Sequence, residues 1–353
     1  MLMHLRSRFQ FYSLRNFVGL FSCLLTLSAC VSTALEVDNR GNQPIPTSAL
    51  SAMKKKGMEP TDPVLVRIFK MESELELWKR DKSGRFALLN TYPMCRWSGQ
   101  LGPKKREGDR QAPEGFYKVN AARLNPKSKF HLSFDLGYPN KLEKSLGYTG
   151  SALMVHGACS SSGCFAISDE YVSEVYAIVR EALRAGQPSF QVQSYPFRMT
   201  IQNMSSHRNN TNFSFWLDLK GGYDRFEVNR LPPKFHFCEG RYRFGKPQKQ
   251  NDYPSDPLLV CPKYNPVEPA IAAFGVKDSQ QNHSTVELQS ASILAYADGG
   301  MNPEYRRVLK ERGADYLSRV TSLTLVPVSR PRAALKDPYK FRKREREAES
   351  LPK

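Results

Sequence analysis

The sequence predicts a β-rich α+β domain. Several short segments alternate apolar and polar residues, as half-buried strands do, and one longer segment repeats its apolar residues at helical spacing. Hydrophobic residues make up 40% and aromatic residues 11% of the 353-residue chain. That composition is sufficient for a substantial core and excludes wholesale disorder.

The strand-like segments begin near residue 64. The alternation of apolar and polar residues predicts strands over residues 64–69 and 74–78, and further strands are predicted at 86–89, 116–119 and 131–134. A stretch rich in glycine, proline and charge separates the third and fourth of these, so we expect a long loop over residues 99–115. Further strand-like sequence follows at 190–200, 213–219 and 322–326.

The clearest helix is predicted over residues 169–185. Its apolar positions keep a helical spacing: Val172, Val175, Tyr176, Val179 and Leu183. Ser168 or Asp169 can cap its start, and Gly186 with Pro188 ends it. A second, short helix is predicted over residues 303–316.

The N-terminus predicts export from the cytosol. Basic and polar residues 1–16 precede a short apolar stretch, 17–27, which is too short to span a bilayer comfortably and is typical of a signal-peptide core. Small residues then precede Cys30, which resembles the cleavage box of bacterial lipoproteins, where Cys30 would receive lipid. Ordinary secretion with cleavage near Ala29 is the alternative. We therefore expect a periplasmic protein, lipid-anchored to the outer membrane.

The charge of the chain favours an anionic partner. Lys and Arg total 52 against 34 Asp and Glu, a formal net charge of +18. Outside the cytosol, the anionic cell wall explains this charge better than nucleic acid, and no nucleic-acid motif with interleaved aromatic residues appears. The expected partners are the anionic cell wall and, through the N-terminal lipid, a membrane, but not nucleic acid.

The chemistry is concentrated between residues 154 and 168. An extended segment presents His156, small residues allow a turn, and Cys164 returns beside the histidine. An imidazole can take the proton of a thiol and so generate the nucleophilic thiolate. The carbonyl of Gly157 can orient the imidazole, and backbone N–H groups of the turn can stabilise an oxyanion. Taken alone, the pair is also compatible with a buried thiol and a chance histidine.

The residue pattern of this segment favours a catalytic pair over a chance one. His156-Gly157, followed closely by Ser161-Ser-Gly-Cys164, resembles the L,D-transpeptidase (YkuD) family of bacterial cell-wall enzymes and, within it, the YafK-like branch. Similar motifs occur in the same order at residues 98–104, 107–117, 136–140 and 197–200, so the resemblance covers roughly residues 62–245.

The resemblance implies a fold, a reaction and a set of site residues. The fold would be the β-rich catalytic domain of that family, a mixed sandwich or barrel-like sheet arrangement with a few helices. Cys164 would be the nucleophile, His156 the base and Gly157 its orienting residue, while Ser162, Gly163 and Tyr138 would contact substrate. Cys164 would form a thioester at meso-diaminopimelate of a peptidoglycan stem peptide, without a metal or cofactor.

The sequence departs from the family at two positions. Most members have Ser-His-Gly-Cys followed by any residue and Arg, whereas this chain has Ser162 before Gly163 and Ala166 in place of the arginine. Three outcomes stay open. An amine can resolve the thioester (transpeptidation), or water can, in a hydrolase or amidase that releases diaminopimelate-linked lipoprotein from the wall. The third is a non-catalytic, basic wall-binding lipoprotein.

The domain organisation follows from these assignments. We expect a signal peptide over 1–29, a polar tether over 30–61, the catalytic domain over 62–245, an extension of unknown role over 246–329 and a basic, mobile tail over 330–353. Cys238 and Cys261 bracket a short loop and can form a disulfide worth roughly 3 kcal/mol, with Cys95 as a competing partner. Cys159 is either a small core residue or a disulfide partner that regulates Cys164.

Overall fold

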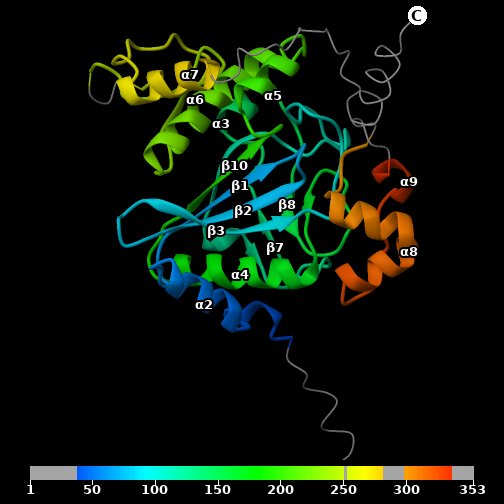
Figure 1. Ribbon diagram of the computed structural model, residues 1–353. Helices are drawn as coiled ribbons and strands as arrows, with labels where there is room; N and C mark the ends of the chain where they lie inside the picture. Colours follow the sequence, from blue (N-terminus) through cyan, green and yellow to red (C-terminus); the bar gives the residue numbers. More distant parts are fainter. Residues whose placement is uncertain (1–37, 250–252, 281–297, 336–353) are drawn as a thin grey trace, which may run out of the picture. The chain divides into compact units, whose positions relative to one another are not determined.

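A computed structural model describes residues 38–249, 253–280 and 298–335 (Figure 1). The predicted signal peptide, Cys30 and the tail beyond residue 335 lie outside the described residues. The described residues from Arg40 onward form one compact unit. Within the described ranges, no helix is long and apolar enough to cross a membrane.

The first sheet contains the strands predicted near the start of the domain. Its order is β3 (Phe86–Pro93), β2 (Glu74–Arg80), β1 (Val64–Phe69), β10 (Phe190–Tyr195) and β5 (Gly115–Val119). Strands β1 and β10 pair in parallel, and the other neighbours are antiparallel. The predicted strands at 64–69, 74–78, 86–89 and 116–119 are therefore confirmed, as is the loop that precedes β5.

The second sheet holds the segment with His156 and Cys164. Its short strands have the order β4 (Arg96–Trp97), β9 (Phe165–Ala166), β8 (Met154–His156), β7 (Ser133–Asp135) and β6 (Leu124–Asn125). Strands β8 and β9 are parallel, although the connection between them is very short. In the described chain both sheets are open, so the α+β prediction is confirmed without a closed barrel.

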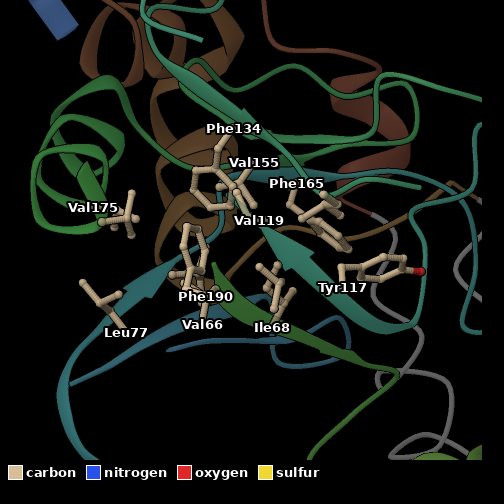
Figure 2. Packing of buried hydrophobic residues seen from close by; sticks show 14 of the residues in the cluster. Val66, Ile68, Leu77, Tyr117, Val119, Phe134, Val155, Phe165, Val175 and Phe190 are labelled. Atoms are coloured by element: carbon tan, nitrogen blue, oxygen red, sulfur yellow. The ribbon is translucent and has the colours of Figure 1, made fainter. Parts of the chain in front are cut away.

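One hydrophobic core joins the two sheets to a helix (Figure 2). Val66 of β1 and Phe190 of β10 come from the first sheet, and Phe134 of β7 comes from the second. The rings of Phe134 and Phe190 meet edge to face, with centroids 5.5 Å apart. Helix α4 (Asp169–Arg184) adds Val175 to this core. The predicted helix is thus confirmed, and the side chain of Ser168 caps it by accepting a hydrogen bond from Tyr171 N.

The other face of the first sheet is covered by helix α6 (Phe213–Asn229). The prediction of a strand over 213–219 is therefore wrong. The helix buries Trp216, Leu219 and Phe226, which recur at helical spacing, and the alternating phenylalanines at its start concealed that period. Because α6 lies over β1, Arg67 on the expected solvent face is buried. Its guanidinium donates to Glu227 Oε1 of α6 at 2.7 Å.

The predicted tether contains ordered structure. Residues 40–42 form η1 (Arg40–Asn42), and α2 (Thr47–Lys55) follows it. Ala49 and Met53 of α2 belong to the main core, because two apolar residues four positions apart face the same side of a helix. The described part of 30–61 is therefore packed onto the domain and is not an extended linker.

The remaining elements lie mostly in the C-terminal half. They are η2 (Ala121–Arg123), α3 (Lys141–Ser145), α5 (Ile201–Ser206), β11 (Phe235–Cys238), β12 (Arg241–Phe244), α7 (Pro269–Gln280), α8 (Pro303–Thr321) and α9 (Pro331–Ala334). Strands β11 and β12 form an antiparallel hairpin. Cys238 at the end of β11 is disulfide-bonded to Cys261, so this pairing, and not one with Cys95, is present.

Helix α8 confirms the helix predicted at 303–316 and extends it, with a kink at Gly313. The strand predicted over 322–326 is wrong. Leu323 and Leu325 are exposed, Leu325 has a positive φ of 53°, and no strand lies beside the segment in the described chain. Alternating apolar residues form a strand only where a sheet edge is available to receive their hydrogen bonds.

Candidate active site

Two neighbouring parallel strands place Cys164 and His156 on the same face of the second sheet. Val155 pairs with Phe165 and His156 with Ala166, so Cys164 continues the register beside Met154. Residues two apart along a strand face the same side, so Met154, His156 and Cys164 share one face. The two candidate catalytic residues are thus separated by one step across the sheet and two residues, roughly 7 Å, along it.

The thiol of Cys164 is half-buried and contacts two main-chain groups. Met154 N donates to Sγ at 3.5 Å, and Sγ lies 3.6 Å from the carbonyl oxygen of Ala152. Burial raises the pKa of Cys164 above its ordinary value, although the Met154 N–H and the nearby Lys104 partly oppose that shift. The thiol is therefore protonated at neutral pH.

The imidazole of His156 is buried and fixed in one orientation. Its Nδ1 lies 2.6 Å from the carbonyl oxygen of Gly157, and the ring of Phe130 stacks on it with centroids 4.7 Å apart. A carbonyl only accepts hydrogen bonds, so Nδ1 carries the proton and Nε2 is the basic nitrogen. Burial lowers the pKa of His156 to about 4.

The resting pair is therefore a neutral thiol and a neutral imidazole. In the described chain no hydrogen bond joins Sγ of Cys164 to the imidazole, whose Nδ1 is bonded to Gly157. The expected thiolate beside an imidazolium is not the state that this structure presents. Were Cys164 to attack a substrate, its thiol would have to turn toward Nε2 of His156 and transfer its proton during the attack.

Close packing explains the glycine after the histidine. A Cβ on Gly157 would lie 2.3 Å from Asp169 Oδ1 and 2.8 Å from the carbonyl oxygen of Phe130. The carbonyl of Gly157 is thus held at the imidazole, as the sequence analysis expected. Gly163, just before the candidate nucleophile, has a φ of +124°, a conformation that L side chains rarely adopt.

Two serine hydroxyls hold the backbone around Cys164. Gly163 N donates to Ser98 Oγ at 2.6 Å, and Cys164 N donates to Ser161 Oγ at 3.2 Å. These N–H groups belong to the turn whose backbone was predicted from the sequence to stabilise an oxyanion. In this structure they bind Ser98 and Ser161, which the sequence analysis did not single out as site residues. The sequence did contain a signal for both serines, since Ser98 begins one of the family-like motifs and Ser161 lies within another.

A buried ion pair supports the loop that faces this turn. Lys70 Nζ donates to the carbonyls of Gly102 and Ala112 and to Glu114 Oε1 at 3.1, 3.0 and 2.9 Å. Both charged side chains are fully buried. The glycine-rich loop over 99–115 is therefore held by hydrogen bonds to the buried ammonium of Lys70. Its Gln111 carbonyl oxygen lies 3.6 Å from the position that a Cβ on Gly163 would occupy.

Of the other predicted contacts, Ser162 is exposed and Tyr138 is structural, and two polar residues near them, Asn140 and His131, are structural as well. Ser162 is exposed beside Cys164 and is available to a substrate. Tyr138 is buried, and its hydroxyl donates to the carbonyl of Lys104 at 3.0 Å, so that hydroxyl supports the loop. Asn140 caps α3, and His131 Nε2 lies 2.8 Å from Ser173 Oγ in a packed position.

The other two free cysteines of the described chain are core residues. Cys95 and Cys159 are both fully buried, and the thiol of Cys159 donates to the carbonyl of Cys95 at 2.8 Å. Cys159 thus faces Cys95 and not Cys164. Among the described residues, no group of three or more His, Cys, Asp or Glu side chains is arranged to hold a metal ion.

The fold and the site together define an α+β domain with a cysteine and a histidine on adjacent strands of a small sheet. The sequence profile of the L,D-transpeptidase catalytic domain (YkuD) matches residues 67–193. The chain is 44% identical over 185 residues to YafK of Escherichia coli K12, a candidate L,D-transpeptidase; the match covers 52% of this chain and 75% of that protein. The chain therefore belongs to the L,D-transpeptidase family, in agreement with the predicted resemblance.

Further comparisons include one sequence relative and two solved structures. YafK of Escherichia coli O157:H7 gives the same 44% identity over 185 residues. The helical cell shape determining protein Pgp2 of Campylobacter jejuni has a TM-score of 0.32 and 19% identity, over 52% of this chain and 66% of that one. Bd1075 of Bdellovibrio bacteriovorus has a TM-score of 0.29 and 16% identity, over 40% of this chain and 51% of that one. Family membership supports a peptidoglycan-related enzyme.

Proposed function

We propose that this protein transfers an acyl group at meso-diaminopimelate of peptidoglycan stem peptides, with Cys164 as the nucleophile. The observation that supports this most is the placement of Cys164 and His156 on one face of adjacent strands in a chain of the L,D-transpeptidase family. Catalysis by a thiol needs a base within reach, and His156 lies on the same face, two residues along β8 from the position beside Cys164.

The chemistry proceeds in two acyl transfers. His156 Nε2 takes the thiol proton as Sγ attacks the carbonyl on the L-centre of diaminopimelate. The amide C–N bond then breaks, the leaving amine takes the proton from the imidazolium, and a thioester remains on Cys164. An incoming amine or water attacks that thioester and releases Cys164 as a thiol, which restores the resting state.

The residue pair after the nucleophile keeps hydrolysis as the second candidate. Phe165 and Ala166 are both fully buried, so neither presents a side chain to a substrate. The position where most of the family has arginine thus offers no cation to an acceptor. A small acceptor such as water makes no demand on that missing contact, and hydrolysis would release a diaminopimelate-linked lipoprotein or shorten the stem.

The cellular setting is part of the proposal and is supported by the sequence alone. The basic start, the apolar stretch over 17–27 and Cys30 favour a periplasmic enzyme with a lipid anchor in the outer membrane. The net charge of +18 favours contact with the anionic wall.

Product analysis tests the reaction. Purified full chain is incubated with disaccharide-tetrapeptide and with wall carrying a diaminopimelate-linked peptide, and products are identified by mass spectrometry. Cross-linked dimers favour transfer, whereas shortened stems or freed peptide favour hydrolysis. Cys164→Ala should lose turnover by several orders of magnitude while circular dichroism stays unchanged.

Two outcomes would overturn the proposal. Unchanged turnover in Cys164→Ala would remove the nucleophile. If wild type produced nothing, but bound wall sacculi in a salt-sensitive way that was indifferent to Cys164, the protein would be a basic wall-binding lipoprotein instead.

A further inference from the structure

The C-terminal segment, residues 298–329, packs against the sheet that carries the candidate pair. It lies outside residues 67–193, which the family profile matches. Gly300 and Trp97 of β4 exchange two backbone hydrogen bonds of 3.1 Å, so the segment extends the edge of the second sheet. Asp298 binds the fully buried Arg96 of β4 at 3.1 Å. Met301, Leu309 and Val328 cover Cys95 and Cys159 in one small core.

One end of this segment holds the turn before Cys164. Ser329 Oγ accepts a hydrogen bond from Ser161 N at 2.9 Å and donates to the carbonyl of Ser161 at 3.3 Å. Ser329 N donates to the carbonyl of Cys159 at 3.2 Å. The carbonyl of Ser329 in turn accepts from Arg96 Nε at 2.9 Å, which fixes it to β4.

Ser161 passes this restraint directly to the candidate nucleophile. Its hydroxyl accepts from Cys164 N at 3.2 Å and donates to the carbonyl of Cys164 at 2.8 Å. The main chain of Ser161 is thus held by Ser329, and its side chain holds both main-chain polar groups of Cys164. A continuous set of hydrogen bonds runs from Arg96 through Ser329 and Ser161 to Cys164.

The same segment also reaches the support of the candidate base. Leu323 N donates to Asp169 Oδ2 at 2.7 Å. Asp169 Oδ1 accepts from Ala158 N at 2.8 Å, directly after the Gly157 carbonyl that binds His156. Asp169 is buried at the start of α4, and Ala158 has a positive φ of 60°. The restraint on His156 therefore also includes a group from beyond residue 298.

We propose that the C-terminal segment is a positioning element of the active site, with Ser329 as a positioning residue for Cys164. The inference rests on the proposed function for its catalytic readout. It assigns to the extension of unknown role a part in holding both members of the pair, and it makes the working domain discontinuous in sequence. A chain ending near residue 245 would lack these restraints.

The test compares three variants of the full chain. Ser329→Ala removes both hydroxyl contacts to Ser161, Ser329→Thr keeps the hydroxyl, and Thr324→Ala removes an exposed hydroxyl of the same segment as a matched control. The measurements are kcat and KM on disaccharide-tetrapeptide, the melting temperature, and the rate at which iodoacetamide labels each free cysteine at pH 7, followed by peptide mass spectrometry.

Ser329→Ala should lower kcat on the order of 10- to 100-fold with KM nearly unchanged, because a misplaced nucleophile weakens the transition state and not substrate binding. Cys164 should label faster, since a looser turn admits water to a thiol that burial keeps protonated. Cys95 and Cys159 should stay protected. Ser329→Thr should restore most of kcat, and Thr324→Ala should match wild type.

Wild-type kcat and wild-type labelling in Ser329→Ala would overturn the inference. Failure of Ser329→Thr to recover, or equal deprotection of all three cysteines, would also overturn it, because either result indicates general destabilisation. If wild type proves inactive on peptidoglycan, the proposed function fails separately. The labelling arm still decides the positioning role, because it needs no substrate.

Discussion

The histidine of the candidate pair is adapted to remain neutral. His156 lies under the ring of Phe130, and burial lowers its pKa to about 4. A base has to be unprotonated to accept a proton, so this environment keeps His156 ready over the whole range in which an ordinary histidine, with a pKa near 6.5, would titrate. As a consequence, the thiol of Cys164 is not ionised in the resting pair.

The pH dependence of turnover follows from this shift. We expect kcat/KM to stay level as pH falls through 6.5 and to decline only as pH approaches 4, where His156 gains its proton. Phe130→Ala should admit water to the imidazole, raise its pKa toward about 6.5 and move the acid limb to higher pH. At pH 5.5 this variant should therefore lose activity relative to its own value at pH 8.

The measurement is a pH–rate profile of wild type and Phe130→Ala in constant ionic strength, with folding checked at each pH. A wild-type acid limb near pH 6.5 would contradict the account, because it would mean that His156 is solvated like an ordinary histidine.

Sequence brings candidate residues together most readily where they are close along the chain. His156, Gly157 and Cys164 fall within one short segment, and the resemblance of that segment to the family, more than its spacing, singled out the pair. Ser329 could not be found in the same way, because it contacts Ser161 across 168 positions of sequence. Its role depends on how the C-terminal segment returns to β4, and nothing in the local pattern around residue 329 indicates that return.

At the scale of elements, α6 shows how a segment with strand-like sequence can form a helix that packs over a sheet. The strand-like start of α6 contains Phe213 and Phe215, but the residues that bury toward the sheet follow a helical period. Gly221 and Gly222 interrupt the apolar pattern, and glycine weakens the case for a helix. The structure explains one of them, since a Cβ on Gly222 would lie 2.4 Å from Phe116 Cζ and 2.5 Å from Phe244 Cε1.

The two adjacent glycines give a matched pair of substitutions. In a helix interior, Gly→Ala gains about 1 kcal/mol of intrinsic propensity. At Gly222 that gain is exceeded by overpacking against two rings, typically about 1–3 kcal/mol, so Gly222→Ala should destabilise the protein. At Gly221 the nearest atom would be Phe244 Cδ2 at 3.2 Å, so Gly221→Ala should be close to neutral.

Chemical denaturation of both variants checks this prediction. Equal stability of Gly221→Ala and Gly222→Ala would show that α6 does not pack against β5 and β12 as described, because only close packing distinguishes the two positions.

At the scale of the whole molecule, the described chain packs together across the domain boundaries that the sequence predicted. Helix α2 packs into the main core although its sequence is polar and rich in small residues, since only Ala49 and Met53 need to face inward. Residues 298–329 complete the edge of the second sheet. Boundaries placed at residues 61 and 245, from composition and from the extent of the resemblance, therefore did not indicate packing that depends on a few buried side chains.

The overall fold class was easier to predict than these boundaries. Strand-like sequence marked β1, β2, β3 and β5, and helical spacing with a capping serine marked α4. These elements repeat their signal over several residues. Two-residue strands such as β4 and β9 carry no period at all, and they form because neighbouring strands supply their hydrogen bonds.

The central claim is that Cys164 becomes acylated, and trapping that intermediate tests it most directly. Wild type is mixed with disaccharide-tetrapeptide, quenched in acid within seconds and digested. The mass of the peptide that contains Cys164 is then measured by mass spectrometry. The account predicts a thioester-sized mass increase on that peptide, labile to hydroxylamine and absent in Cys164→Ala. Product formation at full rate by the Cys164→Ala variant, or a covalent adduct on any other residue, would contradict it.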